Sequence, residues 1–207
     1  MQQINFNNQK IIPGKVVCVG LNYAKHISEL NSRDPKQMVL FIKPNSSISS
    51  KVNLAGRTNC NYEGEISFLI KNKKIIAVAF GLDLTLRKVQ ANLKKRGLPW
   101  EKSKVFPGSA VFSKFVSIKT DQIRNLSLKL FIDNKLVQKG GFQEMIYKPK
   151  QILKEADQCF GLNDYDIIMT GTPEGVGNLK KKQKLRGLIL NKNQISNIFK
   201  TIILSKE

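Results

Sequence analysis

Two carboxylates that lie two residues apart are the first feature of the sequence able to do chemistry. Glu63 and Glu65 begin the largely apolar run that ends at Ile70, which is typical of a β-strand. Side chains alternate between the faces of a strand, so both glutamates are expected on one face, with Gly64 between them. Neighbouring carboxylates repel unless a positive group separates them, and a hard divalent cation suits that position. On its own, an E-x-E pair more often decorates a solvated strand.

A β-hairpin is expected to bring a third carboxylate to the pair. The glutamate strand is followed by the polar turn Asn72–Lys73 and by a second apolar run. With that turn, cross-strand partners have residue numbers that sum to about 145, so Glu63 is expected opposite Leu82. Asp83 then lies one residue beyond, within reach of both glutamates. Three carboxylates without clustered His or Cys favour Mg²⁺, Mn²⁺ or Ca²⁺, with open positions for a bidentate anion such as an α-keto acid.

The only histidine of the chain is a second candidate. His26 follows the apolar strand pattern Lys15–Gly20 and lies in a segment predicted to be a short helix, with Asn22 as its N-cap. On that helix His26 and Glu29 are neighbours on one face. The glutamate can fix the imidazole tautomer and raise its basicity, as a general base requires. A histidine on an apolar face is more often a structural residue, but the position just after a strand favours catalysis.

Three further polar residues follow the second apolar run. Arg87 and Gln90 lie one turn apart on a helix predicted over Thr85–Arg96, where they either face the carboxylates or decorate the surface. Lys104 is one of 29 lysines, so its position alone indicates no more than a surface residue.

The second half of the chain alternates between strand patterns, turns and one helix pattern. Leu126–Ile132 has the alternation of a half-buried strand, and a helix is predicted from Pro149. The strand pattern Asp166–Thr170 runs into the glycine-rich turn Gly171–Gly177, which lacks the spacing of a phosphate-binding loop. Its backbone N–H groups and the Thr172 hydroxyl can bind a carboxylate. Strands dominate the whole chain, which predicts a mostly β fold with a few helices.

Length and charge restrict the class of protein. The 207 residues suit a single domain, residues 1–207, with a short N-terminal segment (1–14) and Lys/Asn-rich closing strands (178–207). The formal net charge of +20 raises nucleic acid as a partner. However, only 6 of the 35 basic residues are Arg, and the lysines are scattered without interleaved aromatics. The charge is therefore interpreted as a solvated coat.

The sequence also indicates a location. No apolar stretch is long enough for a membrane span, and no signal peptide is visible at the N-terminus. Cys18, Cys60 and Cys159 are isolated, which fits neither a disulfide framework nor a zinc site. These features predict a cytoplasmic protein with reduced thiols.

Several ordered motifs together resemble the fumarylacetoacetate hydrolase superfamily, and within it the small acylpyruvase-like branch. The resemblance spans about residues 15 to 180. The motifs are Val19–His26, Phe41–Pro44, Tyr62–Glu65, Gly81–Gln90, Gly97–Lys104 and Gly171–Gly177.

The resemblance implies a fold, an assembly and a set of roles. It implies a rolled β-sheet, usually in a homodimer, and a divalent ion, commonly Mg²⁺, on Glu63, Glu65 and Asp83. It also implies a small keto-acid substrate. By the same resemblance, the catalytic residues are His26, Glu29 and Lys104, and the substrate-binding residues are Arg87, Gln90 and Thr172.

The chain departs from the family pattern at three places. Lys88 and Pro107 stand where the family usually has Asp, and Tyr165 replaces the usual glycine of a Gly-Asp pair. The residues implied to contact metal and substrate are present, so the departures put rate and specificity in doubt rather than the chemistry.

These observations predict a metal-dependent hydrolase that cleaves a carbon–carbon bond of 2,4-diketo acids of the acylpyruvate or fumarylpyruvate type and releases pyruvate. The alternatives on the same site are an oxaloacetate decarboxylase or tautomerase and a 2-hydroxy-diene-dioate isomerase, since each needs a metal-held enolate. The retained His26–Glu29 pair favours hydrolysis. A basic nucleic-acid-binding protein, or a decayed enzyme, is the alternative from another class.

Overall fold

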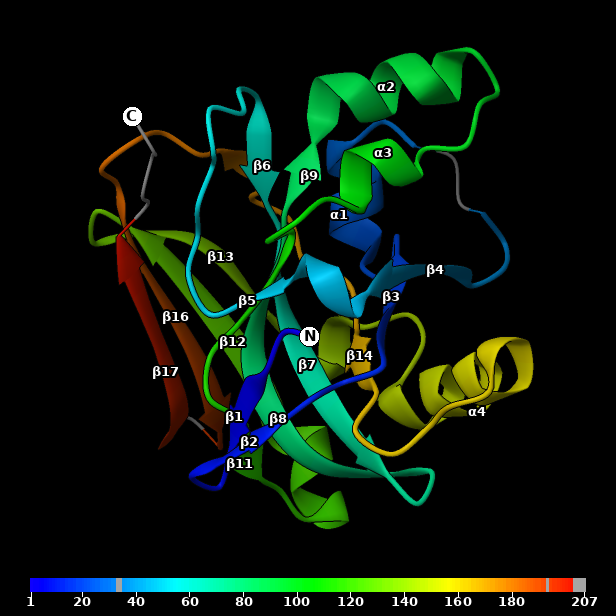
Figure 1. Cartoon of the computed structure of the whole chain (residues 1–207), viewed down its shortest axis with the longest axis vertical. Coiled ribbons are helices and arrows are strands. Elements are labelled where there is room, and N and C mark those ends of the chain that lie inside the picture. The colour runs from blue at the N-terminus through cyan, green and yellow to red at the C-terminus, as the bar shows by residue number, and fades with distance from the viewer. Residues whose placement is uncertain (33–34, 193, 203–207) are drawn as a thin grey trace.

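Strands make up most of the regular secondary structure, and the largest part of it is a strongly curved sheet of eight strands (Figure 1). The computed structural model describes residues 1–32, 35–192 and 194–202. The order across this sheet is β4-β3-β14-β7-β8-β10-β5, and β11 also pairs with β8. The strands are β3 (Lys15–Gly20), β4 (Val39–Pro44), β5 (Ile48–Ser49), β7 (Gly64–Lys71), β8 (Lys74–Asp83), β10 (Ala110–Phe112), β11 (Val116–Ser117) and β14 (Ile167–Met169).

A second, four-stranded sheet lies beside the β7–β8 hairpin (Figure 1). Its order is β13-β12-β16-β17, and all of its pairs are antiparallel. The strands are β12 (Leu126–Ile132), β13 (Lys135–Gly141), β16 (Lys184–Asn191) and β17 (Gln194–Ile202). Two small sheets complete the β-structure: β15 (Gly177–Asn178) with β6 (Cys60–Tyr62) and β9 (Thr85–Leu86), and β1 (Ile4–Phe6) with β2 (Gln9–Ile11).

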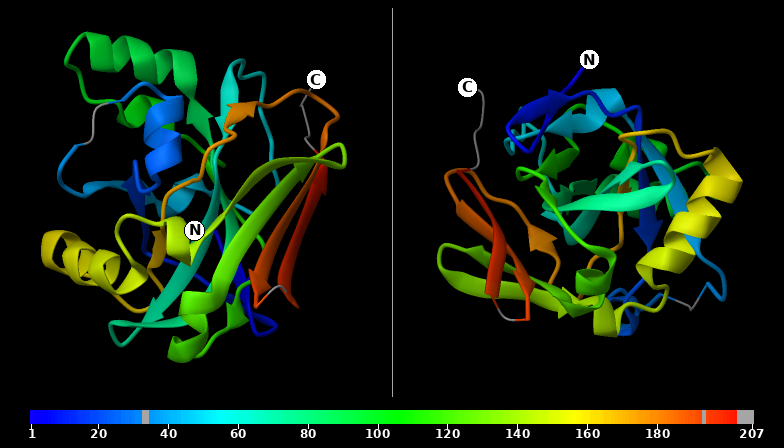
Figure 2. Two further views of the ribbon diagram at one scale, coloured as in Figure 1. Left: turned by 180° about the vertical axis from the view of Figure 1, so that it is seen from behind. Right: turned by 90° about the horizontal axis from the view of Figure 1, so that it is seen from below.

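The helices α1, α2 and α3 gather at one end of the curved sheet, whereas α4 packs on its side (Figures 1 and 2). The helices are α1 (Ala24–Glu29), α2 (Arg87–Lys95), α3 (Glu101–Lys104) and α4 (Pro149–Phe160), with the 3-10 helices η1 (Asn45–Ser47), η2 (Thr120–Asn125) and η3 (Phe142–Glu144). Within the described residues, no helix combines the length and apolar character needed to cross a membrane.

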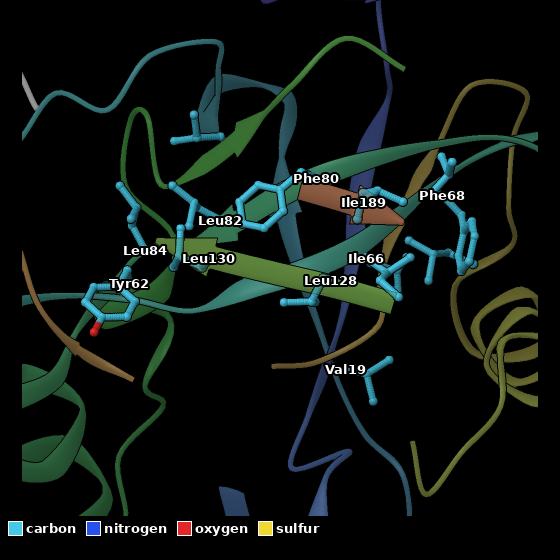
Figure 3. Packing of buried hydrophobic residues seen from close by; sticks show 14 of the residues in the cluster. Val19, Tyr62, Ile66, Phe68, Phe80, Leu82, Leu84, Leu128, Leu130 and Ile189 are labelled. Carbon is cyan, nitrogen blue, oxygen red and sulfur yellow. The ribbon is translucent and has the colours of Figure 1, made fainter. Parts of the chain in front are cut away.

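The main hydrophobic core lies between the two larger sheets. Phe80 and Leu82 of β8 and Leu128 and Leu130 of β12 belong to one cluster of buried residues (Figure 3). Each of these side chains is fully buried, and burial of a side chain of this size stabilises a fold by about 1.5–3 kcal/mol. The core therefore clamps β8, which ends at Asp83, against the second sheet.

The sequence patterns predicted most of these elements. The strand pattern Lys15–Gly20 is β3, and the alternation over Leu126–Ile132 gives a strand whose side chains are alternately buried and half-buried. The helix predicted from Pro149 begins there, with proline in its first turn. The mostly β fold with a few helices and a rolled sheet is confirmed. The predicted closing strands are β16 and β17, but their last part, from Ile203, lies outside the described residues.

Two predicted helix starts were wrong. The helix expected from Thr85 begins at Arg87, because Thr85–Leu86 instead pairs with β6 as the short strand β9. Asn22 is not the N-cap of α1, since Tyr23 occupies that position without a side-chain cap. The Asn22 amide donates instead to the carbonyls of Tyr147 and Thr170, at 3.0 and 2.8 Å. The Asn22 side chain therefore bonds to backbone carbonyls far away in sequence instead of to the first turn of its own helix.

We predict that Gly187→Ala destabilises the fold, because a Cβ at Gly187 of β16 would overlap the ring of Phe80. Overpacking of this kind costs about 1–3 kcal/mol, and Tm should fall by several degrees in thermal unfolding. Gly20→Ala is the matched control, since its Cβ would meet Val39 at an ordinary 3.4 Å. Equal Tm values for the two variants would contradict the close packing of β16 on β8.

Candidate active site

The register of the β7–β8 hairpin determines which carboxylates share a face. Next to the turn, Lys71 pairs with Lys74, as the predicted register requires. A β-bulge between Leu69 and Ile70 then shifts the pairing by one residue. The predicted register is therefore wrong beyond this point, because a bulge is not visible in a two-residue turn.

The shift decides the composition of the site. Gly64, not Glu63, pairs with Leu82, and the Asp83 N–H donates to the Glu63 carbonyl at 2.9 Å. Directly paired residues of an antiparallel sheet point to the same face, and a slip of one residue exchanges the faces. Without the bulge, Asp83 would lie on the opposite face from both glutamates. With it, ligand atoms of Glu63, Glu65 and Asp83 lie within 4.8 Å of one another, and all three side chains are buried.

Two lysines neutralise this buried negative charge. Lys104, from the short helix α3, donates to Glu63 Oε2 at 2.7 Å and to Asp83 Oδ2 at 2.5 Å. Lys43, from β4, lies 2.8 Å from Asp83 Oδ1 and also donates to the side chain and carbonyl of Ser109. Its ammonium further contacts the Lys104 carbonyl. Lys43 is completely buried. Its contacts therefore hold Asp83 and the backbone of Lys104 in place.

Helix α2 presents a third cation to the cluster. Arg87 Nη2 donates to Glu63 Oε1 at 2.5 Å, and Nη1 donates to Gln90 Oε1 at 2.8 Å. The Arg87 Nε atom is buried and has no hydrogen-bond partner within the part of the chain that the structure describes. Of the two orientations that the sequence allowed for Arg87 and Gln90, the structure has the one that faces the carboxylates.

The charges of the cluster shift the ionisation of its members. Burial opposes the charged form of Glu63, but Lys104 and Arg87 outweigh burial and hold the pKa of Glu63 at about 2. Burial raises the pKa of Glu65 well above its ordinary value, and the charges of Asp83 and Glu63 raise it further. Burial would lower the pKa of Lys104, but attraction to Asp83 and Glu63 raises it. Among the carboxylates of the cluster, Glu63 and Asp83 each form ion pairs, whereas Glu65 has none within the described residues.

The glycine-rich turn after β14 forms the opposite wall. The Gly171 N–H donates to Glu65 Oε2 at 2.7 Å. Thr172 donates from its hydroxyl to the Gly64 carbonyl at 3.0 Å and accepts a hydrogen bond of 2.8 Å from Gln138 Nε2. The Gln138 oxygen accepts from the Gly64 N–H at 2.8 Å. Gln138 of β13 therefore ties the metal-ligand strand to the turn.

The predicted dyad closes the cavity from α1. His26 is buried, and its Nδ1 lies 3.0 Å from Glu29 Oε2. The other oxygen of Glu29 accepts from the Gly175 N–H at 2.9 Å, so the carboxylate is held from two sides. The imidazole is thereby oriented with its Nε2 left for another partner.

The structure brings the predicted site residues into one cavity. Glu29 is the exception, because it does not line the cavity itself but contacts His26, which does. The predicted residues that line it are His26, Glu63, Glu65, Asp83, Arg87, Gln90, Lys104 and Thr172. Sequence reasoning missed Lys43, Gln138 and Lys94. A lysine within the apolar strand pattern of β4 was a visible signal for Lys43, whereas Gln138 and Lys94 gave none.

One protein-family model matches almost the whole chain. Its description is fumarylacetoacetate (FAA) hydrolase C-terminal, and it matches residues 15–194. The chain belongs to the fumarylacetoacetate hydrolase family. The resemblance of the ordered motifs is thus confirmed.

Several curated relatives are named for the same activity, oxaloacetate tautomerase. An oxaloacetate tautomerase of Escherichia coli (strain K12) is 37% identical over 188 residues, which cover 83% of this chain and 86% of that protein. Mitochondrial oxaloacetate tautomerases of Saccharomyces cerevisiae and Homo sapiens are each 34% identical. The matches cover 86% of this chain and 88% of the yeast protein, and 82% of this chain and 84% of the human protein.

Solved structures of the fumarylacetoacetate hydrolase family share the fold. A provisionally assigned fumarylacetoacetate isomerase/hydrolase from Oleispira antarctica has a TM-score of 0.92 and 31% identity, covering 99% of this chain and 100% of that one. A fumarylpyruvate hydrolase from Pseudomonas aeruginosa, in complex with Mn²⁺ and pyruvate, has a TM-score of 0.88 and 23% identity, covering 99% and 96%. At that identity the second likeness shows the fold alone.

The carboxylate cluster of this family member fits a divalent metal ion. Its donors are carboxylate oxygens only, which hard cations prefer, and they lie close enough together to share one ion. Glu65 is buried beside two negative groups and has no cationic partner among the described side chains. A cation between these groups would stabilise its charged form.

We predict that Mg²⁺ or Mn²⁺ raises the Tm of the protein, and that chelation reverses the effect. At about 100 times the dissociation constant, an ion that binds only the folded state adds about 2.7 kcal/mol. Glu65→Gln should abolish the rise in Tm, because it removes a ligand from the cluster. Glu101→Gln, at an exposed glutamate on α3, is the control. An undiminished metal effect in Glu65→Gln would place the ion elsewhere.

We also predict a pH-dependent cost of Lys104→Met in the presence of a chelator. With a folded-state pKa of about 2 against an ordinary 4.5, the ionised Glu63 stabilises the fold above pH 4.5. That contribution is lost as the pH falls toward 2. Loss of one partner from a buried pair costs about 3–5 kcal/mol at neutral pH. In urea unfolding, the difference from the parent protein should shrink on acidification.

The matched control for this pH series is Lys102→Met, at an exposed residue of the same helix. It should change stability little, and equally at every pH. A cost of Lys104→Met that stays constant down to acidic pH would contradict an ion pair with Glu63.

Proposed function

We propose that the protein is a divalent-metal-dependent tautomerase that interconverts the enol and keto forms of oxaloacetate. The observation that carries the proposal is the buried carboxylate cluster, with Lys104 bridging Glu63 and Asp83, inside one cavity. Several curated relatives, 34–37% identical over most of the chain, are named oxaloacetate tautomerases. These relatives support the tautomerase, which the sequence analysis gives as an alternative, over the hydrolase that it predicts.

In this proposal, Glu63, Glu65 and Asp83 hold the metal ion, which we expect to be Mg²⁺, with Mn²⁺ or Ca²⁺ as substitutes. A bound divalent ion supplies polarisation of the 2-keto group and stabilises the negative charge of its enolate. Lys43 keeps Asp83 in place from behind, through the 2.8 Å ion pair.

Tautomerisation moves one proton from the enol oxygen on C2 to the C3 carbon. We propose that His26, oriented by Glu29, accepts the enol proton at Nε2, because Nδ1 faces the Glu29 carboxylate. Lys104 donates a proton from Nζ to C3, since its raised pKa keeps the ammonium charged until it meets a carbanion-like carbon. One proton leaves the substrate and one is returned, and proton exchange with solvent must return His26 to the neutral and Lys104 to the charged form before the next turnover. In the reverse direction the two groups exchange roles.

Arg87, Gln90 and Thr172 are the proposed substrate-binding residues. The buried Arg87 Nε is a free donor among the described residues, so it suits a substrate oxygen. The Thr172 hydroxyl already donates to the Gly64 carbonyl, so it must exchange that bond to donate to a substrate carboxylate. The backbone of the turn keeps it at the cavity wall.

Hydrolysis of 2,4-diketo acids remains a second candidate, favoured by the His26–Glu29 contact at 3.0 Å. There His26 would activate a water molecule for attack on the distal carbonyl. We also propose that residues 1–207 form one catalytic domain that acts as a cytoplasmic homodimer. Sedimentation equilibrium tests the dimer, and a monomer at micromolar concentration would contradict it.

The experiment that tests the proposed function follows the ultraviolet absorbance of enol-oxaloacetate as it converts to the keto form, with Mg²⁺ and with a chelator. We predict metal-dependent acceleration, and a loss of about 10²–10⁴-fold in Lys104→Met, since a positioned proton donor contributes that much. Lys102→Met should keep full activity. Release of pyruvate from acetylpyruvate is measured in parallel.

The two assays separate the candidates. If the protein does not accelerate the absorbance change, the tautomerase proposal fails. If it releases pyruvate from acetylpyruvate instead, and His26→Gln abolishes that release, the hydrolase is correct.

A further inference from the structure

A fourth cation lies at the outer part of the cavity. Lys94 lines it together with Arg87 and Gln90, and all three belong to α2. Their spacing of three and four residues places them along one face of the helix. Arg87 reaches the carboxylates, Gln90 is buried behind it, and Lys94 follows one turn further out, with its residue exposed at the rim.

Lys94 differs from the other cations of the site in its partners. Arg87 is paired with Glu63, and Lys104 with Glu63 and Asp83. Among the described residues, Lys94 has no carboxylate within ion-pair distance, and its ammonium lies 5.6 Å from the centre of the Trp100 ring. Partial burial lowers the pKa of Lys94, and repulsion by Arg87 and Lys104 lowers it further. Attraction to Glu63 offsets this only in part, so the charge of the Lys94 ammonium is poorly compensated.

The charge of the whole cavity matches a doubly negative ligand. Three carboxylates and three cations line it, the cations being Arg87, Lys94 and Lys104. Lys43, which pairs with Asp83 from outside the cavity lining, adds one further positive charge, so a divalent ion on the carboxylates would leave at least two positive charges in excess. A dicarboxylate neutralises two of them, whereas a 2-keto acid with an uncharged tail neutralises only one. The other lining residues include the apolar side chains of Leu30 and Val39, and Trp100 offers only the neutral N–H of its indole, so none of these three competes with the Lys94 ammonium as a charged donor.

We propose that Lys94 is a specificity-determining residue, which binds the carboxylate of the substrate that is distal to the metal-bound end and so selects a short 2-keto dicarboxylate. The inference rests on the proposed function for the orientation of the substrate, with its 2-keto carboxylate at the Glu63–Glu65–Asp83 cluster. It adds Lys94 as the group that binds the carboxylate at the other end of the substrate. Arg87 and Lys104 are already engaged beside that cluster, and Lys94 lies further along the same cavity.

The test uses two stable ligands that differ only in the distal carboxylate, malate and lactate, each titrated by calorimetry into the full-length protein saturated with Mg²⁺. Both offer the same 2-hydroxy-carboxylate to the metal. A hydrogen bond to a charged group contributes about tenfold or more in affinity. The parent protein should therefore bind malate at least about tenfold more tightly than lactate.

Variants of α2 assign this preference to one side chain. Lys94→Met should weaken malate binding about tenfold and leave lactate binding unchanged, while Lys94→Arg should retain the preference. Lys95→Met, at the adjacent exposed lysine that does not line the cavity, is the matched control. Equal losses for malate and lactate in Lys94→Met, or no loss for either, would overturn the proposal.

Kinetics with oxaloacetate give an independent readout. Lys94→Met should raise KM for oxaloacetate about tenfold and change kcat little, because the ammonium binds the substrate away from the reacting C2–C3 bond. A fall in kcat with unchanged KM would overturn the binding role. If the parent protein does not turn over oxaloacetate but Lys94→Met still loses its preference for malate, the proposed function fails and the role of Lys94 stands. Turnover without any malate preference would refute Lys94 alone.

Discussion

The burial of three carboxylates beside one another is the constraint on which the rest of the structure depends. Unpaired charges are expensive inside a protein, so cations must reach the cluster from outside the hairpin that carries it. Lys43 arrives from β4 and Lys104 from α3, and both are buried against Asp83. One electrostatic requirement, the neutralisation of the buried carboxylates, therefore fixes the relative positions of β4, α3 and the β7–β8 hairpin. A divalent ion would satisfy the same requirement at the side of Glu65.

The bulge in the hairpin serves the same cluster through the backbone, because it turns Asp83 to the face of the two glutamates. Strong local patterns predict strands and turns well, as at β3, β12 and α4, because apolar periodicity reports burial directly. They do not report a single inserted residue such as Ile76, which has no partner opposite Leu69 and Ile70, although it decides that Asp83 faces the two glutamates. The three carboxylates therefore lie together as predicted, but through a pairing that the turn alone does not predict.

The site residues divide in the same way. Motifs led to His26, Lys104, Arg87 and Thr172, and the structure brings all of them to one cavity. Gln138 was not predictable, because its function in the fold is to bridge β7 and the turn after β14, which are far away in sequence. Contacts between distant segments depend on how sheets stack, and no periodicity in the chain encodes them. The same reason explains why Asn22 joins two carbonyls instead of capping its own helix.

The withdrawal of acidic side chains into the interior has a consequence at long range. The chain has only 15 acidic residues against 35 basic ones, and four of the acidic ones, at Glu63, Glu65, Asp83 and Asp166, are buried. Lys43 and Lys104 are buried as well, so among the described residues burial removes four negative and two positive side chains from the surface, and the solvent-facing side stays strongly positive. A field of one sign attracts anions from beyond contact distance and raises their encounter rate. If the proposed keto-acid substrate is correct, its capture depends on ionic strength, since physiological salt screens charges over about 8 Å.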